Sequence, residues 1–210
     1  RYIVMKLDEN ERGNLSRLMK VKDMMLEEQL EKARARARAP LPATKARNRH
    51  TGMKISRMFA EKKALLSFEI FPPKKDAGTE AVRGTIAELS ALHPDYISVT
   101  CSAGGSGNAR TCEIAQLVKS CGTEPLAHVT CIHAEGSGVR ATLGELRDAG
   151  IENVLALRGD RIEGARESEQ FRHASDLVRF IRAGWDFDIA GACYPEGHPE
   201  SPDLPTAVSY

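Results

Sequence analysis

Long apolar runs and paired cysteines are absent from this 210-residue sequence. No apolar segment reaches the about 18 residues that a membrane-spanning helix needs, and the start lacks the apolar stretch of a secretory signal. The five cysteines include no CxxC pair, which is typical of reduced thiols in a cytosolic protein rather than of a disulfide framework. These absences predict a cytoplasmic protein that does not enter a membrane.

Three common cofactor and metal motifs are also missing. The glycine-rich stretch AGGSGN (103–108) is followed by no GK[ST], and it lacks the GxGxxG spacing of a dinucleotide fingerprint. Glu196, His198 and Glu200 alternate in a proline-interrupted loop, which does not match the helical HExxH zinc motif. We therefore expect no metal site. The formal net charge of +1 gives no global reason to expect nucleic acid.

The first 52 residues differ in composition from the rest of the chain. Residues 15–30 place leucine and methionine at roughly helical spacing between charged residues, which predicts an amphipathic helix. A basic stretch with alanine and proline follows and is typical of an extended linker. It can contact nucleic acid or acidic lipid, but a solvated helix face or an uncleaved leader from an upstream reading frame also explains it. We predict a charged helical extension over 1–52, with no assigned function, and a separate domain over 53–210.

From Met53 onward, short apolar runs rich in β-formers alternate with helical stretches. The expected strands cover 64–71, 95–101, 125–132, 153–159 and 187–194, and the expected helices lie between them, within about 82–92, 110–120, 137–149 and 174–183. This alternation predicts right-handed βαβ crossovers and a parallel sheet. The near-continuous apolar strands agree, because parallel strands are buried on both faces.

Five βα units are compatible with two α/β architectures. One is a complete open doubly wound sheet, and the other is the first part of a (βα)8 barrel, which typically needs roughly 250 residues. Both architectures bind ligands at the carboxyl ends of their strands. Each expected strand carries polar or ionisable residues at that end, namely Glu69, Thr100, His128, Arg158 with Asp160, and Tyr194 with His198. The convergence predicts an active site at one edge of the sheet.

Glu69 lies between Phe68 and Ile70 in an otherwise apolar strand. Burial there would penalise the charged carboxylate, so that Glu69 would serve as a general acid near neutral pH. The alternative is a glutamate at a strand end that points to solvent or pairs with an arginine.

The other strand ends also allow two interpretations each. Arg158 in LRGD (157–160) is suited to clamping a phosphate or a polar ring edge, although an ion pair with Asp160 would explain it too. His128 is a ligand-binding group or a hydrogen-bonded core histidine. Tyr194 is suited to packing against a planar cofactor to which His198 donates a hydrogen bond. The AGGSGN loop can approach a phosphate or a ring closely, or it is a plain flexible turn.

Six segments together resemble the methylenetetrahydrofolate reductase family. They are SFEIFPPK (67–74), YISVTCSAGGSGN (96–108), AHVTCI (127–132), NVLALRGD (153–160), HASDLV (173–178) and YPEGHPES (194–201), and they occur in family order with family-like spacing. The resemblance runs from about Met53, within MKISRMFAEKK, to Tyr210, and residues 1–52 have no counterpart in it.

The resemblance implies a (βα)8 barrel that holds FAD noncovalently at the carboxyl ends of its strands. NADH or NADPH reduces the flavin and departs, 5,10-methylenetetrahydrofolate takes its place, and the flavin hydride reduces the methylene carbon to a methyl group. The acid that opens the folate ring would be Glu69, and Asp160 would lie near the flavin and the folate. The residues that line the FAD site would be Thr100, Cys101, Ala103, His128, Arg158, Gly159, Asp160, Ala174, Tyr194 and His198. Cys101 stands where many relatives carry tyrosine, so that a ring contact to FAD is expected to be lost.

The family's sixth to eighth strands have no counterpart within the 210 residues, so the resemblance implies about the first five βα units of a barrel. An open fragment would expose strand edges, which predicts poor solubility or pairing with another chain. We expect a homo-oligomer or an accessory subunit in the complete protein. The rival hypothesis is a noncatalytic binding or assembly module that uses a partial α/β barrel as its scaffold.

Overall fold

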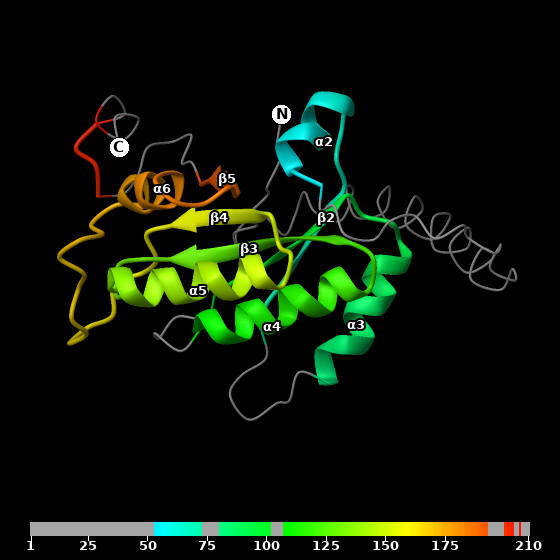
Figure 1. The fold of residues 1–210 in the computed structure, drawn as a ribbon, viewed down its shortest axis with the longest axis horizontal. Coiled ribbons are helices and arrows are strands. Elements are labelled where there is room, and N and C mark those ends of the chain that lie inside the picture. Colours follow the sequence, from blue (N-terminus) through cyan, green and yellow to red (C-terminus); the bar gives the residue numbers. More distant parts are fainter. Residues whose placement is uncertain (1–52, 73–79, 102–106, 193–199, 204–205, 207–210) are drawn as a thin grey trace, which may run out of the picture. The chain divides into compact units, whose positions relative to one another are not determined.

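The computed structural model describes residues 53–72, 80–101, 107–192, 200–203 and 206 (Figure 1). One compact unit, formed by residues 49–90 and 94–210, holds the whole sheet. The strands are β1 (Ser67–Ile70), β2 (Tyr96–Val99), β3 (Glu124–Thr130), β4 (Asn153–Leu157) and β5 (Asp188–Gly191). The helices are α2 (Ile55–Glu61), α3 (Glu80–Ala91), α4 (Gly107–Ser120), α5 (Gly136–Asp148) and α6 (Ala174–Arg182). All five predicted strands are confirmed, each somewhat shorter than expected.

The strands are parallel and lie side by side in chain order, β1-β2-β3-β4-β5. A doubly wound sheet reverses its strand order at a switch point and places helices on both faces. The observed order has no such reversal, and right-handed crossovers that always step in one direction place their helices on one face. The sheet is therefore singly wound, and the doubly wound alternative is wrong for the described residues.

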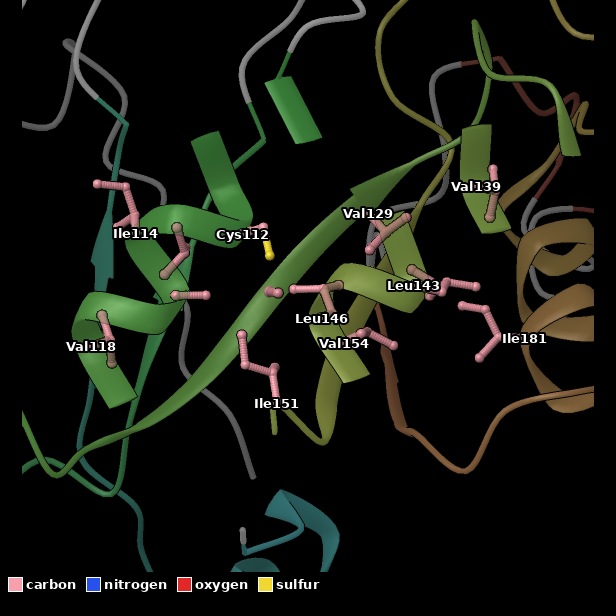
Figure 2. Packing of buried hydrophobic residues seen from close by; sticks show 14 of the residues in the cluster. Cys112, Ile114, Val118, Val129, Val139, Leu143, Leu146, Ile151, Val154 and Ile181 are labelled. Atoms are coloured by element: carbon pink, nitrogen blue, oxygen red, sulfur yellow. The ribbon is translucent and has the colours of Figure 1, made fainter. Parts of the chain in front are cut away.

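The main hydrophobic core lies between the sheet and the four helices α3 to α6. Alternate strand residues point into it, and each helix contributes its apolar face. Figure 2 shows side chains from α4 and α5 gathered beside β3, with Ile181 of α6 close to Leu143 and Val154. The core members without solvent exposure include Ile86, Ile97, Val99, Ile114, Val118, Val129, Leu143, Val154, Leu177 and Ile181.

A smaller apolar cluster lies on the opposite face of the sheet, where α2 packs. Its buried members are Ile55 and Met58 of α2 with Tyr96 and Leu126 of the strands. Tyr96 is the first residue of β2, and Leu126 of β3 is level with Ser98. On β2 and β3 the cluster reaches no further than this level, so the strand ends beyond it are left for other side chains.

Helix α2 was not predicted, because its start depends on residues distant in the sequence. The residue before it, Lys54, provides no side-chain cap. Instead Asn153 Oδ1 accepts the N–H of Ile55 at 2.8 Å, and Asp188 Oδ2 accepts the N–H of Ser56 at 2.6 Å. The first residues of β4 and β5 thus supply the acceptors that a helix normally finds in its own N-cap.

Candidate active site

The carboxyl ends of the five strands lie at one edge of the sheet, because all five strands run parallel. Glu69 is the penultimate residue of β1, Thr100 directly follows β2, His128 lies in the second half of β3, and Arg158 directly follows β4. The predicted convergence of these four positions at one edge is confirmed. Tyr194 and His198 lie outside the described residues, and so does Ala103.

Glu69, Ser98 and His128 share the sheet face opposite the helices. Their chain neighbours on either side point into the helix-covered core, and side chains alternate between the two faces of a strand. Glu69 pairs in register with Ser98, and Ser98 Oγ lies 2.7 Å from His128 Nε2. The three residues therefore form a polar row across β1, β2 and β3.

His128 is held as a neutral imidazole. Its side chain is 7% exposed, and burial lowers its pKa from 6.5 to about 4. A neutral imidazole has one N–H and one free lone pair, so the hydrogen bond with Ser98 leaves the other ring nitrogen available for a second partner. His128 is thus both a hydrogen-bonded core histidine and a candidate ligand-binding group.

Glu69 does not have the buried setting that its apolar neighbours suggested. The residue is exposed, and β1 shows burial at Ile70 only, with Phe68 half-buried. Of the two alternatives for Glu69, the structure therefore agrees with a glutamate that points to solvent. The reason is that Phe68 and Ile70 pack against the helices, whereas Glu69 points to the other face, which α2 covers only near the amino ends.

The segment after β2 is fixed through its backbone. The N–H of Thr100 donates to the carbonyl of Ile70 at 3.0 Å, and the Thr111 hydroxyl of α4 donates to the carbonyl of Thr100 at 3.0 Å. Cys101 is half-buried, with its Sγ 3.5 Å from the Thr130 hydroxyl at the end of β3. These contacts hold the ends of β2 and β3 together at the start of the glycine-rich stretch.

Arg158 pairs with Glu200 and not with Asp160 as the ion-pair alternative supposed. Its Nη1 and Nη2 donate to the two carboxylate oxygens of Glu200 at 2.6 and 2.9 Å. Hydrogen bonds to Glu200 raise the pKa of Arg158 more than partial burial lowers it, so the guanidinium stays charged. This bidentate pair joins the end of β4 to the segment that follows β5.

Gly159 and Asp160 follow Arg158 in a tightly packed turn. Gly159 has a φ of +88°, and a Cβ there would lie 3.1 Å from Cβ of Thr130. Only glycine combines this backbone conformation with so close an approach to β3. Asp160 comes next and is exposed, with its backbone carbonyl 3.1 Å from His133 Nε2. The turn thus presents the Asp160 carboxylate to solvent at the edge of the sheet.

Ala174 is the first residue of α6 and is half-buried. The carboxylate of Asp176 accepts the N–H groups of His173 and Arg172 at 2.9 and 3.0 Å. Burial alone would raise the pKa of Asp176, but these two N–H groups, together with Arg179, lower it. A charged Asp176 therefore fixes the chain where it enters α6.

Two buried cysteines, Cys112 and Cys131, are held as thiols. Burial raises the pKa of Cys131 to about 12 and also raises that of Cys112. Within the described ranges, no group of three histidine, cysteine or acidic side chains is placed to hold a metal ion. No helix among the residues that the structure describes is long and apolar enough to span a bilayer.

The family model for methylenetetrahydrofolate reductase matches residues 54–210. The chain belongs to this family. It is 38% identical over 137 residues to the 5,10-methylenetetrahydrofolate reductase of Escherichia coli (strain K12), a match that covers 65% of this chain and 46% of that relative. It is 36% identical over 168 residues to methylenetetrahydrofolate reductase (NADH) 1 of Arabidopsis thaliana, covering 75% of this chain and 28% of the plant protein.

The chain spans about half the length of the bacterial reductase and a smaller share of the plant one. Among solved structures, a mandelate racemase/muconate lactonizing protein from Paracoccus denitrificans PD1222 superposes with a TM-score of 0.39 at 12% identity. The match covers 62% of this chain and 34% of that one, and it is too weak to bear on the fold. The family assignment therefore rests on sequence.

In this methylenetetrahydrofolate reductase family member, the structure adds four polar side chains to the predicted edge: Ser98, Thr130, His133 and Glu200. Ser98 and Thr130 alternate with core residues along their strands. Once the strand positions are known, this alternation places both on the sheet face opposite helices α3 to α6, here called the open face. Glu200 was considered only as a metal ligand, and nothing in its spacing from Arg158 reveals their contact.

Proposed function

We propose that this chain forms the front part of a flavin-dependent reductase that converts 5,10-methylenetetrahydrofolate to 5-methyltetrahydrofolate with NADH or NADPH. The observation that carries the proposal is the family match over residues 54–210, combined with a parallel sheet whose carboxyl edge holds the matching motif residues. Relatives are named for reduction of this folate, and those in plants are named for NADH.

The proposed architecture is a (βα)8 barrel of which this sheet forms the first five units. Sequential strand order and a single helix layer support it, since a barrel needs both. The face that bears Glu69, Ser98 and His128 would then be the barrel interior. Helix α2 would close that interior at the amino ends of the strands.

The residues at the carboxyl edge fit a flavin cofactor. They offer a charged guanidinium in Arg158, a neutral imidazole in His128, and a close backbone approach at Gly159. These groups suit phosphate oxygens and the polar edge of a planar ring. FAD, when bound, supplies the hydride. Its proposed contacts are the residues Thr100, Cys101, Ala103, His128, Arg158, Gly159, Asp160, Ala174, Tyr194 and His198.

Glu69 is proposed to donate the proton that opens the folate ring. Its exposure gives a substrate direct access to the carboxyl group. Asp160, exposed at the neighbouring edge, is proposed to anchor the pterin.

A cytoplasmic location and assembly into a homo-oligomer or with an accessory subunit are part of the proposal. Three of the described cysteines, Cys112, Cys121 and Cys131, carry free thiols, which is typical of a reducing compartment.

Flavin uptake tests the proposal. The purified chain, with and without added FAD, is expected to show the visible absorbance of bound flavin after gel filtration. Replacing Arg158 with Ala should weaken FAD binding roughly 10- to 100-fold, because a charge-assisted contact is lost. The matched control is Arg57→Ala, which removes an exposed arginine on α2 that pairs with Glu61. A chain that takes up no FAD, or an Arg57 variant as weak as the Arg158 variant, contradicts the proposed site.

A further inference from the structure

The connection between β4 and α6, residues 158–173, forms no helix or strand and carries Asp160. Its far end is well anchored. Phe171 is 1% exposed and packs edge-on against Phe180, with ring centroids 5.3 Å apart. The N–H of Ser168 donates to the carbonyl of Ile132 at 2.6 Å. The segment between Asp160 and Ser168 therefore forms a loop whose two ends both contact the residues that follow β3.

His133 contacts the backbone at both ends of this loop. Its Nδ1 lies 2.9 Å from the carbonyl oxygen of Arg166, and its Nε2 lies 3.1 Å from that of Asp160. Carbonyl oxygens only accept hydrogen bonds, and a neutral imidazole has a single N–H to donate. Both contacts are satisfied only when both ring nitrogens carry a proton. The two carbonyl partners together match the two N–H groups of a doubly protonated ring.

The charges around His133 are compatible with a cation at this position. Arg161 pairs with Glu167 at 3.0 Å, and Arg166 pairs with Glu169 at 3.3 Å, so each neighbouring guanidinium is balanced by a carboxylate. Asp160, whose backbone carbonyl His133 contacts, is itself an acidic residue. The Arg161–Glu167 pair also forms a second cross-link within the same loop.

We propose that His133, protonated on both ring nitrogens, is a positioning residue that holds the β4–α6 loop closed and thereby places Asp160 at the carboxyl edge. Loss of one proton breaks one of the two contacts and loosens the loop. The consequence for Asp160 rests on the proposed function, whereas closure of the loop by His133 does not.

Amide hydrogen exchange of the 210-residue chain, followed by NMR without flavin or folate, tests this inference. The amides of Ala165 and Ser168 report on the loop, because their N–H groups donate to the carbonyls of Ile162 and Ile132. After correction for intrinsic exchange, their protection should fall roughly tenfold between about pH 5 and about pH 8, as one hydrogen bond to a charged donor is lost. The ring nitrogen signals of His133 should show two protonated nitrogens at the lower pH and one at the higher.

Two variants distinguish the effect of His133 protonation from a general loss of loop stability. In His133→Gln the protection of both amides should be low and the same at the two pH values. In Glu167→Gln, which breaks the other cross-link, protection should drop at both pH values while the roughly tenfold difference remains. Protection in the unmodified chain that does not change with pH, or a pH effect that survives in His133→Gln, overturns the inference.

If a variant does not fold, the ring nitrogen signals of the unmodified chain decide: a single protonated nitrogen at about pH 5 overturns the inference. Because no cofactor is added, the result stands whether or not FAD binds.

Discussion

The two faces of the sheet differ in what their side chains do. Strand residues that face α3 to α6 are apolar and form one continuous buried cluster. The opposite face is mixed: apolar residues pack on α2, and Glu69, Ser98 and His128 lie beside and beyond them on β1, β2 and β3. The comparison shows that successive residues of one strand have different roles. Those pointing to the helices form the core, and those pointing to the other face contribute to the candidate active site.

The physical reason lies in coverage of each face. Four helices remove the first face from water, so a polar side chain there is costly unless it finds a hydrogen-bond partner. Helix α2 has seven residues and covers one end of the second face, which leaves room for polar groups near the strand ends. Substitutions on the first face should therefore change folding stability, and those on the second should change chemistry or pH response.

The largest expected effect is on the helix-covered face. Leu143→Ala should lower the free energy of unfolding by about 3 to 4 kcal/mol, because a fully buried side chain of α5 leaves a cavity. The matched change on the other face is Leu155→Ala, at a partly buried position beside α2, with an expected loss of roughly half as much. Chemical denaturation of both variants measures the two losses. A loss at Leu155 equal to that at Leu143 would break the comparison.

His128, on the open face, should make the free energy of unfolding depend on pH. Its pKa is about 4 in the folded chain and near 6.5 when unfolded, so between these values the unfolded chain binds the extra proton. Unfolding free energy should therefore fall as the pH drops from about 6.5 to about 4, by about 3 kcal/mol in total, and change little from this source above that window. Denaturation curves of wild type and His128→Gln isolate this contribution, because other titrating groups cancel in the difference. An unchanged slope in the variant would contradict a buried neutral His128.

Asn153 holds the start of α2 against β4, and its replacement should lower the free energy of unfolding by less than the two changes above. Its side chain accepts from the N–H of Ile55 and donates to the carbonyl of Met53 at 3.1 Å. Asn153→Ala leaves both groups without this partner and should cost about 2 kcal/mol. Asn153→Asp keeps the acceptor and loses the donor, so its α2 amides should exchange more slowly than those of the alanine variant. Equal exchange at Ile55 in wild type and Asn153→Ala would refute the remote cap.

The sheet and four of its helices could be predicted because their signals are local. Apolar runs at 95–101 and 153–159 reappear as β2 and β4, and the helical spacing around Leu143 reappears in α5. Helix α2 could not be predicted, since its N–H acceptors come from Asn153 and Asp188. The strand order, which distinguishes a singly from a doubly wound sheet, is likewise a tertiary property.

The candidate site was predictable in position but not in detail. Strand ends are visible in sequence, so Thr100, His128 and Arg158 were located correctly. Whether a strand residue is buried depends on which face the helices cover, so the sequence left the setting of Glu69 open between burial and exposure. The Arg158 partner Glu200 lies 42 residues away in the chain, beyond the reach of any spacing rule.

The most direct test of the central claim uses the protein with Glu69→Gln and measures its two half-reactions separately. Reduction of bound flavin by NADH or NADPH should proceed at the wild-type rate, because the proposed acid acts only in the folate step. Reoxidation of the reduced flavin by 5,10-methylenetetrahydrofolate should slow by about 100-fold or more, as expected for loss of a general acid. Equal loss of both half-reactions, or an undiminished folate step, would contradict the role of this face of the sheet in folate reduction.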